Sequence, residues 1–233
     1  TQFQAQAYKE LLPADGPVRA QIMGAISPEK QDQAHRVKDF MNYQLMDQMK
    51  EYEPEFDQML FYLPLTGSTF KKVYYDELLG RAVSKFIQAE DLIVPYTASS
   101  LEDADAIVHV IKISENDLRK QQVGGFYRDI ELGDPPINES QIKTKQLELE
   151  GVTANDQQRE SMYTLLEVHT DLDLEDYPDV NENEEPTGIK LPYIITIDET
   201  SQQVLSIRRN YEPEDPLKKK KNYFVQFKFL PGT

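Results

Sequence analysis

The sequence predicts an α+β protein in which long N-terminal helices pack on a mostly antiparallel sheet. Three observations support this class. Apolar residues recur at helical spacing through most of residues 1–66, residues 70–87 alternate as in a β-hairpin, and several short β-rich runs follow. We therefore expect two parts in the chain, a helical part at residues 1–66 and a β-rich part at residues 67–233.

The helical part contains two long periodic stretches. The first covers residues 3–12, and residues 18–26 after it have the composition of a short strand. Ser27 is a favourable helix cap, so the second stretch begins there. Its apolar positions are Ala34, Val37, Phe40, Met41, Leu45 and Met49, then Phe56, Met59, Leu60 and Leu63. Pro54 interrupts this series, which indicates two helices or one kinked helix, and Gly67 ends it.

The hairpin follows directly after Gly67. Over residues 70–76 each face of the predicted strand carries aromatic or β-branched side chains together with polar ones. One face has Phe70, Lys72, Tyr74 and Asp76, and the other has Lys71, Val73 and Tyr75. A short loop ending at Gly80 allows positive φ, and residues 82–87 then return antiparallel to the first strand.

The remainder of the chain is predicted to be rich in strands. Residues 106–113 form the first of them, and Ser114 caps the helix that follows. Polar and turn-forming residues dominate 131–160, so we expect a surface excursion there. Further strands are predicted at residues 163–170, 193–198, 204–209 and 223–230.

The composition narrows the possible functions. The chain has 41 acidic and 25 basic side chains and a net charge of −16, which argues against a general nucleic-acid-binding surface. It has no cysteine, so disulfides and thiolate metal sites are excluded. No apolar run reaches 18 residues, and we expect no membrane span.

The densest charge lies in residues 171–185. Five of its acids have the spacing of the oxygen ligands in a calcium-binding loop: Asp171, Asp173, Glu175, Asp179 and Glu182. However, Asp176 stands where such a loop needs glycine, and the segment follows a strand instead of a helix. A solvated hairpin loop is therefore the favoured interpretation. The alternative function is a divalent-metal-dependent phosphodiesterase or nuclease that uses this acidic stretch.

One basic cluster is present, at Lys218, Lys219, Lys220 and Lys221. These lysines can contact DNA or an acidic loop of a neighbouring subunit, and a solvated turn that protects an edge strand is the simpler interpretation. No nucleophile elbow and no phosphate-binding glycine loop occur in the sequence. We therefore expect neither catalytic residues nor a cofactor.

Several ordered segments resemble the portal, or head-to-tail connector, proteins of short-tailed tailed bacteriophages. The most specific are Leu-Pro-Leu-Thr-Gly-Ser-Thr-Phe-Lys-Lys-Val-Tyr-Tyr-Asp at residues 63–76 and Glu-Asp-Leu-Ile-Val-Pro-Tyr at residues 90–96. The similarity continues through residues 108–110, 125–130, 191–193 and 227–232. None of these segments is a chemical motif, so the resemblance depends on their order and number.

The resemblance implies a structural protein with a portal wing-like fold. In full length, such a protein forms a ring, typically of twelve subunits, at one capsid vertex, through which viral DNA is packaged and ejected. The implied partners are other copies of the chain, capsid and scaffolding proteins, the terminase, a tail adaptor and the passing DNA. The implied location is the virion, with host cytoplasm during assembly.

The resemblance also implies that the stem, clip and tunnel-lining segments lie beyond Gly232 and are not in this sequence. Ring assembly needs complementary surface patches on adjacent subunits. We expect opposite charges, including the lysine run at residues 218–221, to contribute to ring closure.

Overall fold

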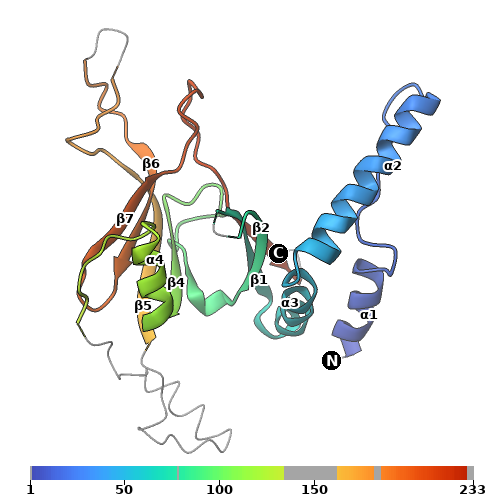
Figure 1. The fold of residues 1–233 in the computed structure, drawn as a ribbon, viewed down its shortest axis with the longest axis horizontal. Helices are drawn as coiled ribbons and strands as arrows, with labels where there is room; N and C mark the ends of the chain where they lie inside the picture. The colour runs from blue at the N-terminus through green and yellow to red at the C-terminus, as the bar shows by residue number, and fades with distance from the viewer. Residues whose placement is uncertain (1, 78, 134–161, 181–184, 230–233) are drawn as a thin grey trace, which may run out of the picture. The chain divides into compact units, whose positions relative to one another are not determined.

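The computed structural model describes residues 2–77, 79–133, 162–180 and 185–229 (Figure 1). The chain divides into two compact units, with residues 1–90 and 222–233 in unit 1 and residues 91–221 in unit 2. The described residues contain four α-helices and two antiparallel sheets. The α+β class is confirmed, but two sheets replace the single sheet that we expected. Unit 1 contains both helices and strands, whereas the predicted parts at residues 1–66 and 67–233 describe helix and strand content along the chain and stay a prediction.

The helices of unit 1 are α1 (Gln2–Leu11), α2 (Pro28–Tyr43) and α3 (Tyr52–Thr66). The Ser27 side chain accepts a hydrogen bond from the Lys30 amide and caps α2, as predicted. A π-helical turn at Gln44–Gln48 continues α2 before the break to α3, so the second periodic stretch forms two helices. Gly67 ends α3 in the left-handed conformation, with φ of 73°.

The prediction of a strand at residues 18–26 is wrong. Residues 17–27 lie outside any helix or strand and form an extended segment, which we call the strap. A strand needs a neighbouring strand for its backbone hydrogen bonds, whereas the Val18 amide donates to the side chain of Asn42 on α2.

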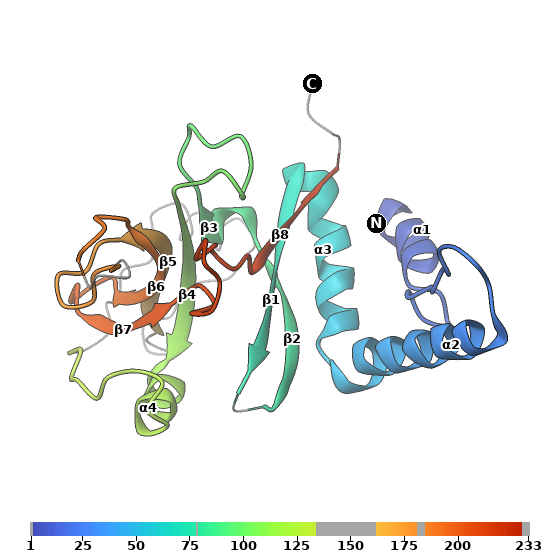
Figure 2. The same cartoon turned by 90° about the horizontal axis from the view of Figure 1, so that it is seen from above.

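The sheet of unit 1 has the order β2-β1-β8. Its strands are β1 (Ser68–Asp76), β2 (Arg81–Ile87) and β8 (Phe224–Lys228). The predicted hairpin is confirmed, with Phe70 opposite Ile87 and Tyr75 opposite Ala82. Helix α3 lies along this sheet (Figure 2). Its buried side chains Phe56, Met59 and Leu60 pack with Phe86 of β2 and Phe227 of β8.

Lys71 of β1 is buried in this same core and is 4% exposed. Its Nζ lies 4.4 Å from the centre of the Tyr52 ring and 5.1 Å from that of Phe56. This ammonium group has no hydrogen-bond partner within the described residues. Burial lowers the pKa of Lys71 to about 8, while the charges of Glu55 and Glu51 act in the opposite direction.

The sheet of unit 2 has the order β3-β4-β5-β6-β7. Its strands are β3 (Leu92–Ile93), β4 (Ala106–Ser114), β5 (Met162–Leu172), β6 (Leu191–Asp198) and β7 (Val204–Arg209). Helix α4 (Glu115–Val123) follows β4, and the Ser114 side chain caps it as predicted. Leu118 of α4 packs into a core with Ile113, Tyr127, Tyr163, Leu165 and Leu205. The surface excursion predicted at residues 131–160 lies outside the described residues from residue 134 onward.

Candidate functional site

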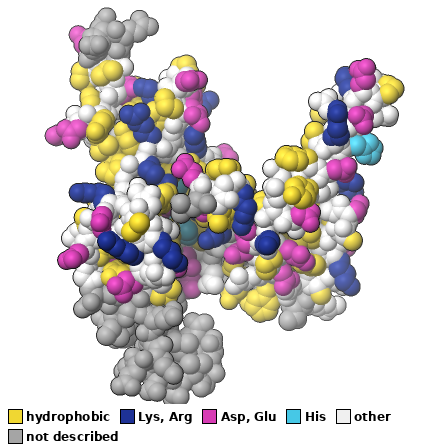
Figure 3. Space-filling view, in the orientation of Figure 1, with side chains coloured by type: hydrophobic (Ala, Val, Ile, Leu, Met, Phe, Trp, Pro, Cys, Tyr) yellow, Lys and Arg dark blue, Asp and Glu magenta, His cyan; other side chains and the backbone are white. Residues whose placement is uncertain are grey.

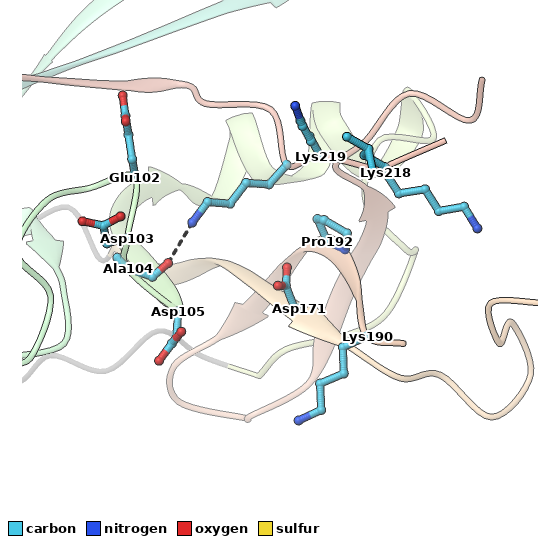
Figure 4. Close-up of a pocket in the computed structure, with 11 residues that line it drawn as sticks. Glu102, Asp103, Ala104, Asp105, Asp171, Lys190, Pro192, Lys218 and Lys219 are labelled. Atoms are coloured by element: carbon cyan, nitrogen blue, oxygen red, sulfur yellow. Dashed lines mark hydrogen bonds between the residues drawn. The ribbon is translucent and has the colours of Figure 1, made fainter. Parts of the chain in front are cut away.

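The acidic stretch and the lysine run, the two charged features of the sequence, border one hollow of unit 2. The hollow has a volume of about 400 Å³ (Figure 4). It is lined by Glu102, Asp103, Ala104, Asp105, Asp171, Lys190, Pro192, Leu217, Lys218, Lys219 and Lys220. Acidic and basic side chains are also interspersed over the face of the molecule in Figure 3. The lining thus has four acids and four lysines, and it does not present a surface of one sign.

The segment between β7 and β8, residues 210–221, presents the lysines, and we call it the lysine loop. Its two ends are joined through Asn210, which is buried. The Asn210 carbonyl accepts from the Lys221 amide at 2.9 Å, and its Nδ2 donates to the Lys221 carbonyl at 3.2 Å. Its own amide donates to Pro192 at 2.9 Å. These bonds fix the base of the loop on β6.

Asp215 organises the middle of the lysine loop. Its carboxylate accepts hydrogen bonds from the amides of Leu217 at 3.0 Å and Lys219 at 3.1 Å. These bonds lower the pKa of Asp215, because they stabilise the charged carboxylate. Lys218 adopts the left-handed conformation, with φ of 45°. The turn is therefore an ordered structure that gives each lysine its own direction.

Three of the four lysines bind groups of the same chain. Lys218 forms an ion pair with Asp179, and Lys221 forms one with Glu212 at 2.5 Å. The Lys220 ammonium donates to the Ala104 carbonyl at 2.9 Å, which is the dashed line in Figure 4. The Lys219 ammonium has no hydrogen bond or ion pair to the described part of the chain. From the sequence, a solvated turn was the simpler interpretation of these lysines, and DNA or an acidic loop of a neighbouring subunit were the alternatives. In the structure Lys218 pairs with the acidic stretch of its own chain.

Asp179 is the centre of the acidic stretch. Its carboxylate is buried and accepts a hydrogen bond from the Thr187 hydroxyl at 2.6 Å, in addition to the ion pair with Lys218. The Thr187 amide donates to the Asp179 carbonyl, and Val180 pairs with Pro186 in an antiparallel bridge. This bridge agrees with the hairpin that we favoured for the stretch. Asp179 is thus engaged in holding the stretch to the lysine loop.

The other candidate metal ligands do not gather around Asp179. Asp171 lines the hollow, Asp173 and Glu175 are exposed, and Glu182 lies outside the described residues. Over the described ranges, no three His, Asp or Glu side chains lie close enough together to bind a metal ion. A hard cation needs several converging oxygen ligands. The metal site and the nuclease alternative therefore stay predictions.

The structure also shows a buried polar pair that was not predicted from the sequence. The Glu167 carboxylate and His169 Nε2 lie 2.7 Å apart on β5, and both side chains are buried. They share a face of the strand with Tyr163 and Leu165, since residues two apart point the same way. In the sequence, the alternation places Glu167 and His169 on the same face of the strand, but it does not show which face is buried.

No protein-family model matches the sequence, and a comparison with curated proteins finds no match. None of the helices in the described ranges is long and apolar enough to cross a bilayer. The functional proposal therefore depends on the segments that resemble portal proteins and on the geometry of each unit.

Proposed function

We propose that this chain is the wing-like region of a portal protein. Such a protein is a structural subunit of a ring at one capsid vertex, through which viral DNA is packaged and ejected. The observation that supports this proposal most is the ordered series of resembling segments at residues 63–76, 90–96, 108–110, 125–130, 191–193 and 227–232. Several independent segments in the same order are more specific than any one of them.

These segments coincide with structural elements of the two units. The first contains β1, the central strand of its sheet, and Phe227 packs against α3. Tyr127 and Tyr193 are buried in separate clusters of unit 2. A resemblance that falls on core positions supports a shared fold, which is what we expect for a protein whose role is architectural.

The charge of the chain is compatible with this role. A net charge of −16 gives this chain little attraction for DNA phosphates, so a wing region of this composition would not retain the DNA that passes through the ring. The basic cluster does not oppose it strongly, because Lys218 and Lys221 are neutralised by Asp179 and Glu212. The proposed partners are other copies of the chain in a ring of about twelve, capsid and scaffolding proteins, terminase and a tail adaptor.

The test uses the full natural gene product that contains this chain. We expect native mass spectrometry to give one dominant closed oligomer, and electron microscopy to show rings with an axial channel. A product that stays monomeric, or that forms only two-fold symmetric dimers, would refute the proposal. A nuclease assay with plasmid DNA and manganese on the same sample distinguishes the enzymatic alternative.

A further inference from the structure

One part of unit 1 has a regular backbone but makes few contacts with the rest of the unit. Helix α2 and the strap, residues 17–43, together form what we call the arm. Helix α2 has no buried residue over its 16 positions. Its main contact among helices and strands is the π-helical turn that continues it. In Figures 1 and 2, α2 leads away from α3, with the strap beside it.

The arm nevertheless has a defined internal structure. Asn42 binds the strap at the base of α2, because its Oδ1 accepts from the Val18 amide at 2.9 Å and its Nδ2 donates to the Val18 carbonyl at 3.3 Å. Gly16 approaches Asn42 so closely that a Cβ there would lie 2.4 Å from the side chain. Near the other end, the Lys30 ammonium donates to the Ala25 carbonyl at 3.2 Å. The strap is therefore attached to α2 near both ends of the helix.

The apolar side chains of the arm face solvent. They are Val37 (48% exposed), Phe40 (59%) and Met41 (43%) on α2, with Met23 (90%) and Ile26 (67%) on the strap. Phe40 and Met41 lie three and four positions after Val37, so the three side chains form a stripe along one face of the helix. Hydrophobic side chains are visible along this part of the molecule in Figure 3.

This arrangement is unfavourable for an isolated chain. Isolated helices shorter than about 12–15 residues are marginally stable in water, and the 16-residue helix α2 is little longer. Helices in proteins gain most of their stability from burying an apolar face. The strap is hydrogen-bonded to α2 at Asn42 and Lys30, and the apolar stripe of α2 stays exposed beside it. The exposed stripe therefore requires another surface.

The charge distribution indicates what supplies that surface. The arm has four basic and three acidic side chains, a net charge of +1, so the rest of the chain has a net charge of −17. Two copies that approach through their acidic surfaces repel each other. The arm has no net negative charge, so the acidic surface of one copy can contact the arm of the next without this repulsion.

We infer that the arm docks onto a second copy of this chain, with Val37, Phe40 and Met41 buried in the contact. Because the near-neutral arm of one copy meets the acidic surface of another, the contact is head-to-tail, and such contacts form a ring when the rotation between successive copies closes. The inference goes beyond the proposed function, which requires a ring but specifies no surface. The choice of a second copy as partner rests in part on that function.

The size of the arm favours a ring over an isolated pair. One face of a 16-residue helix is about 24 Å long and about 10 Å wide. It therefore buries less than the roughly 800 Å² per partner of a stable interface. A single arm contact is weak. In a closed ring each copy both donates and receives an arm, so breaking one contact does not release a subunit.

Photo-crosslinking tests the inference, because the chain has no cysteine to interfere. Gln33→Cys places a benzophenone maleimide one helical turn before Val37, at the end of the stripe, and Asn116→Cys places the same label on α4 as a control. Equal amounts of ¹⁴N and ¹⁵N protein are mixed and irradiated, and crosslinked peptides are identified by mass spectrometry. We expect mixed-isotope peptides that join the arm to another copy, with a lower yield from the control position.

Two further variants test the physical basis. Replacing Val37, Phe40 and Met41 by serine should lower the crosslink yield by about tenfold or more, whereas Val123→Ser on α4 should not change it. Arg36→Glu with Lys38→Glu makes the arm acidic, so its yield should fall at low salt and recover at high salt. Circular dichroism confirms that each variant keeps its helices.

The inference is overturned if no mixed-isotope crosslink forms, or if the serine substitutions leave the yield unchanged. It is also overturned if the charge-reversed arm crosslinks as well as the original at low salt. Rings that persist without arm crosslinks refute the inference and leave the proposed function intact. Arm crosslinks without rings do the opposite.

Discussion

Replacing Lys71 with methionine is expected to stabilise unit 1 at neutral pH. Burial lowers the pKa of Lys71 from 10.5 to about 8, and each pKa unit corresponds to about 1.4 kcal/mol, so the buried charge costs roughly 3 kcal/mol. The rings of Tyr52 and Phe56 offset about 1–2 kcal/mol of that cost through cation–π contacts. Methionine has a similar length and no charge, so we expect a gain of about 1–2 kcal/mol at pH 7.

The gain should depend on pH in a definite direction. The folded-state pKa of Lys71 lies below the unfolded-state value, so between about pH 8 and 10.5 the unfolded state binds more protons. The stability of the natural protein therefore rises across this window, and the cost of the buried charge is fully present below it. The advantage of methionine should be largest at pH 7 and should shrink toward pH 10.5.

Urea denaturation followed by far-UV circular dichroism at pH 7 and pH 10 measures both effects. Lys85→Met on β2 is the control, because Lys85 is exposed and its replacement should change the unfolding free energy by less than about 0.5 kcal/mol. If Lys71→Met lowers stability at pH 7, or if its effect is the same at both pH values, then the ammonium group is not the cost that we infer.

Two other predictions concern unit 2. Asp179→Asn should lower the unfolding free energy by about 1–3 kcal/mol, because it leaves Lys218 without its buried partner. The control is Glu212→Gln, which breaks only the exposed pair with Lys221 and should lower the unfolding free energy by less than about 1 kcal/mol. Equal losses for the two variants in urea titrations would contradict this difference. Calorimetric titration with millimolar calcium, magnesium or manganese should give no binding heat, and a heat that Asp171→Asn abolishes would instead favour the nuclease alternative.

Local signals in the sequence predicted the ends of the elements well. Ser27 and Ser114 cap helices because their side chains reach amides three residues ahead, and Gly67 ends α3 because it adopts positive φ without strain. The hairpin at β1 and β2 was equally predictable, since its alternation and its turn lie within one short segment.

Features that depend on distant residues could not be predicted in this way. Phe70 of β1 pairs with Gln226 of β8, and nothing in either segment specifies the other as its partner. The strap has a strand-like composition, yet Asn42 takes the hydrogen bonds that a neighbouring strand would supply. On β5 the polar residues Glu167 and His169 lie on the buried face, because the fold places them against each other.

The partners of the lysine run change the physical picture of assembly. The resemblance led us to expect that opposite charges on adjacent subunits, including the lysine run, contribute to ring closure, but Lys218 and Lys221 already pair within their own chain. Exposed ion pairs contribute at most about 1 kcal/mol and are screened by salt. The free energy of association must then come mainly from apolar surface such as the stripe on α2, against the mutual repulsion of subunits with a net charge of −16. Salt weakens this repulsion and leaves apolar burial intact, so assembly through the arm is favoured by added salt, whereas assembly through charge pairs is opposed by it.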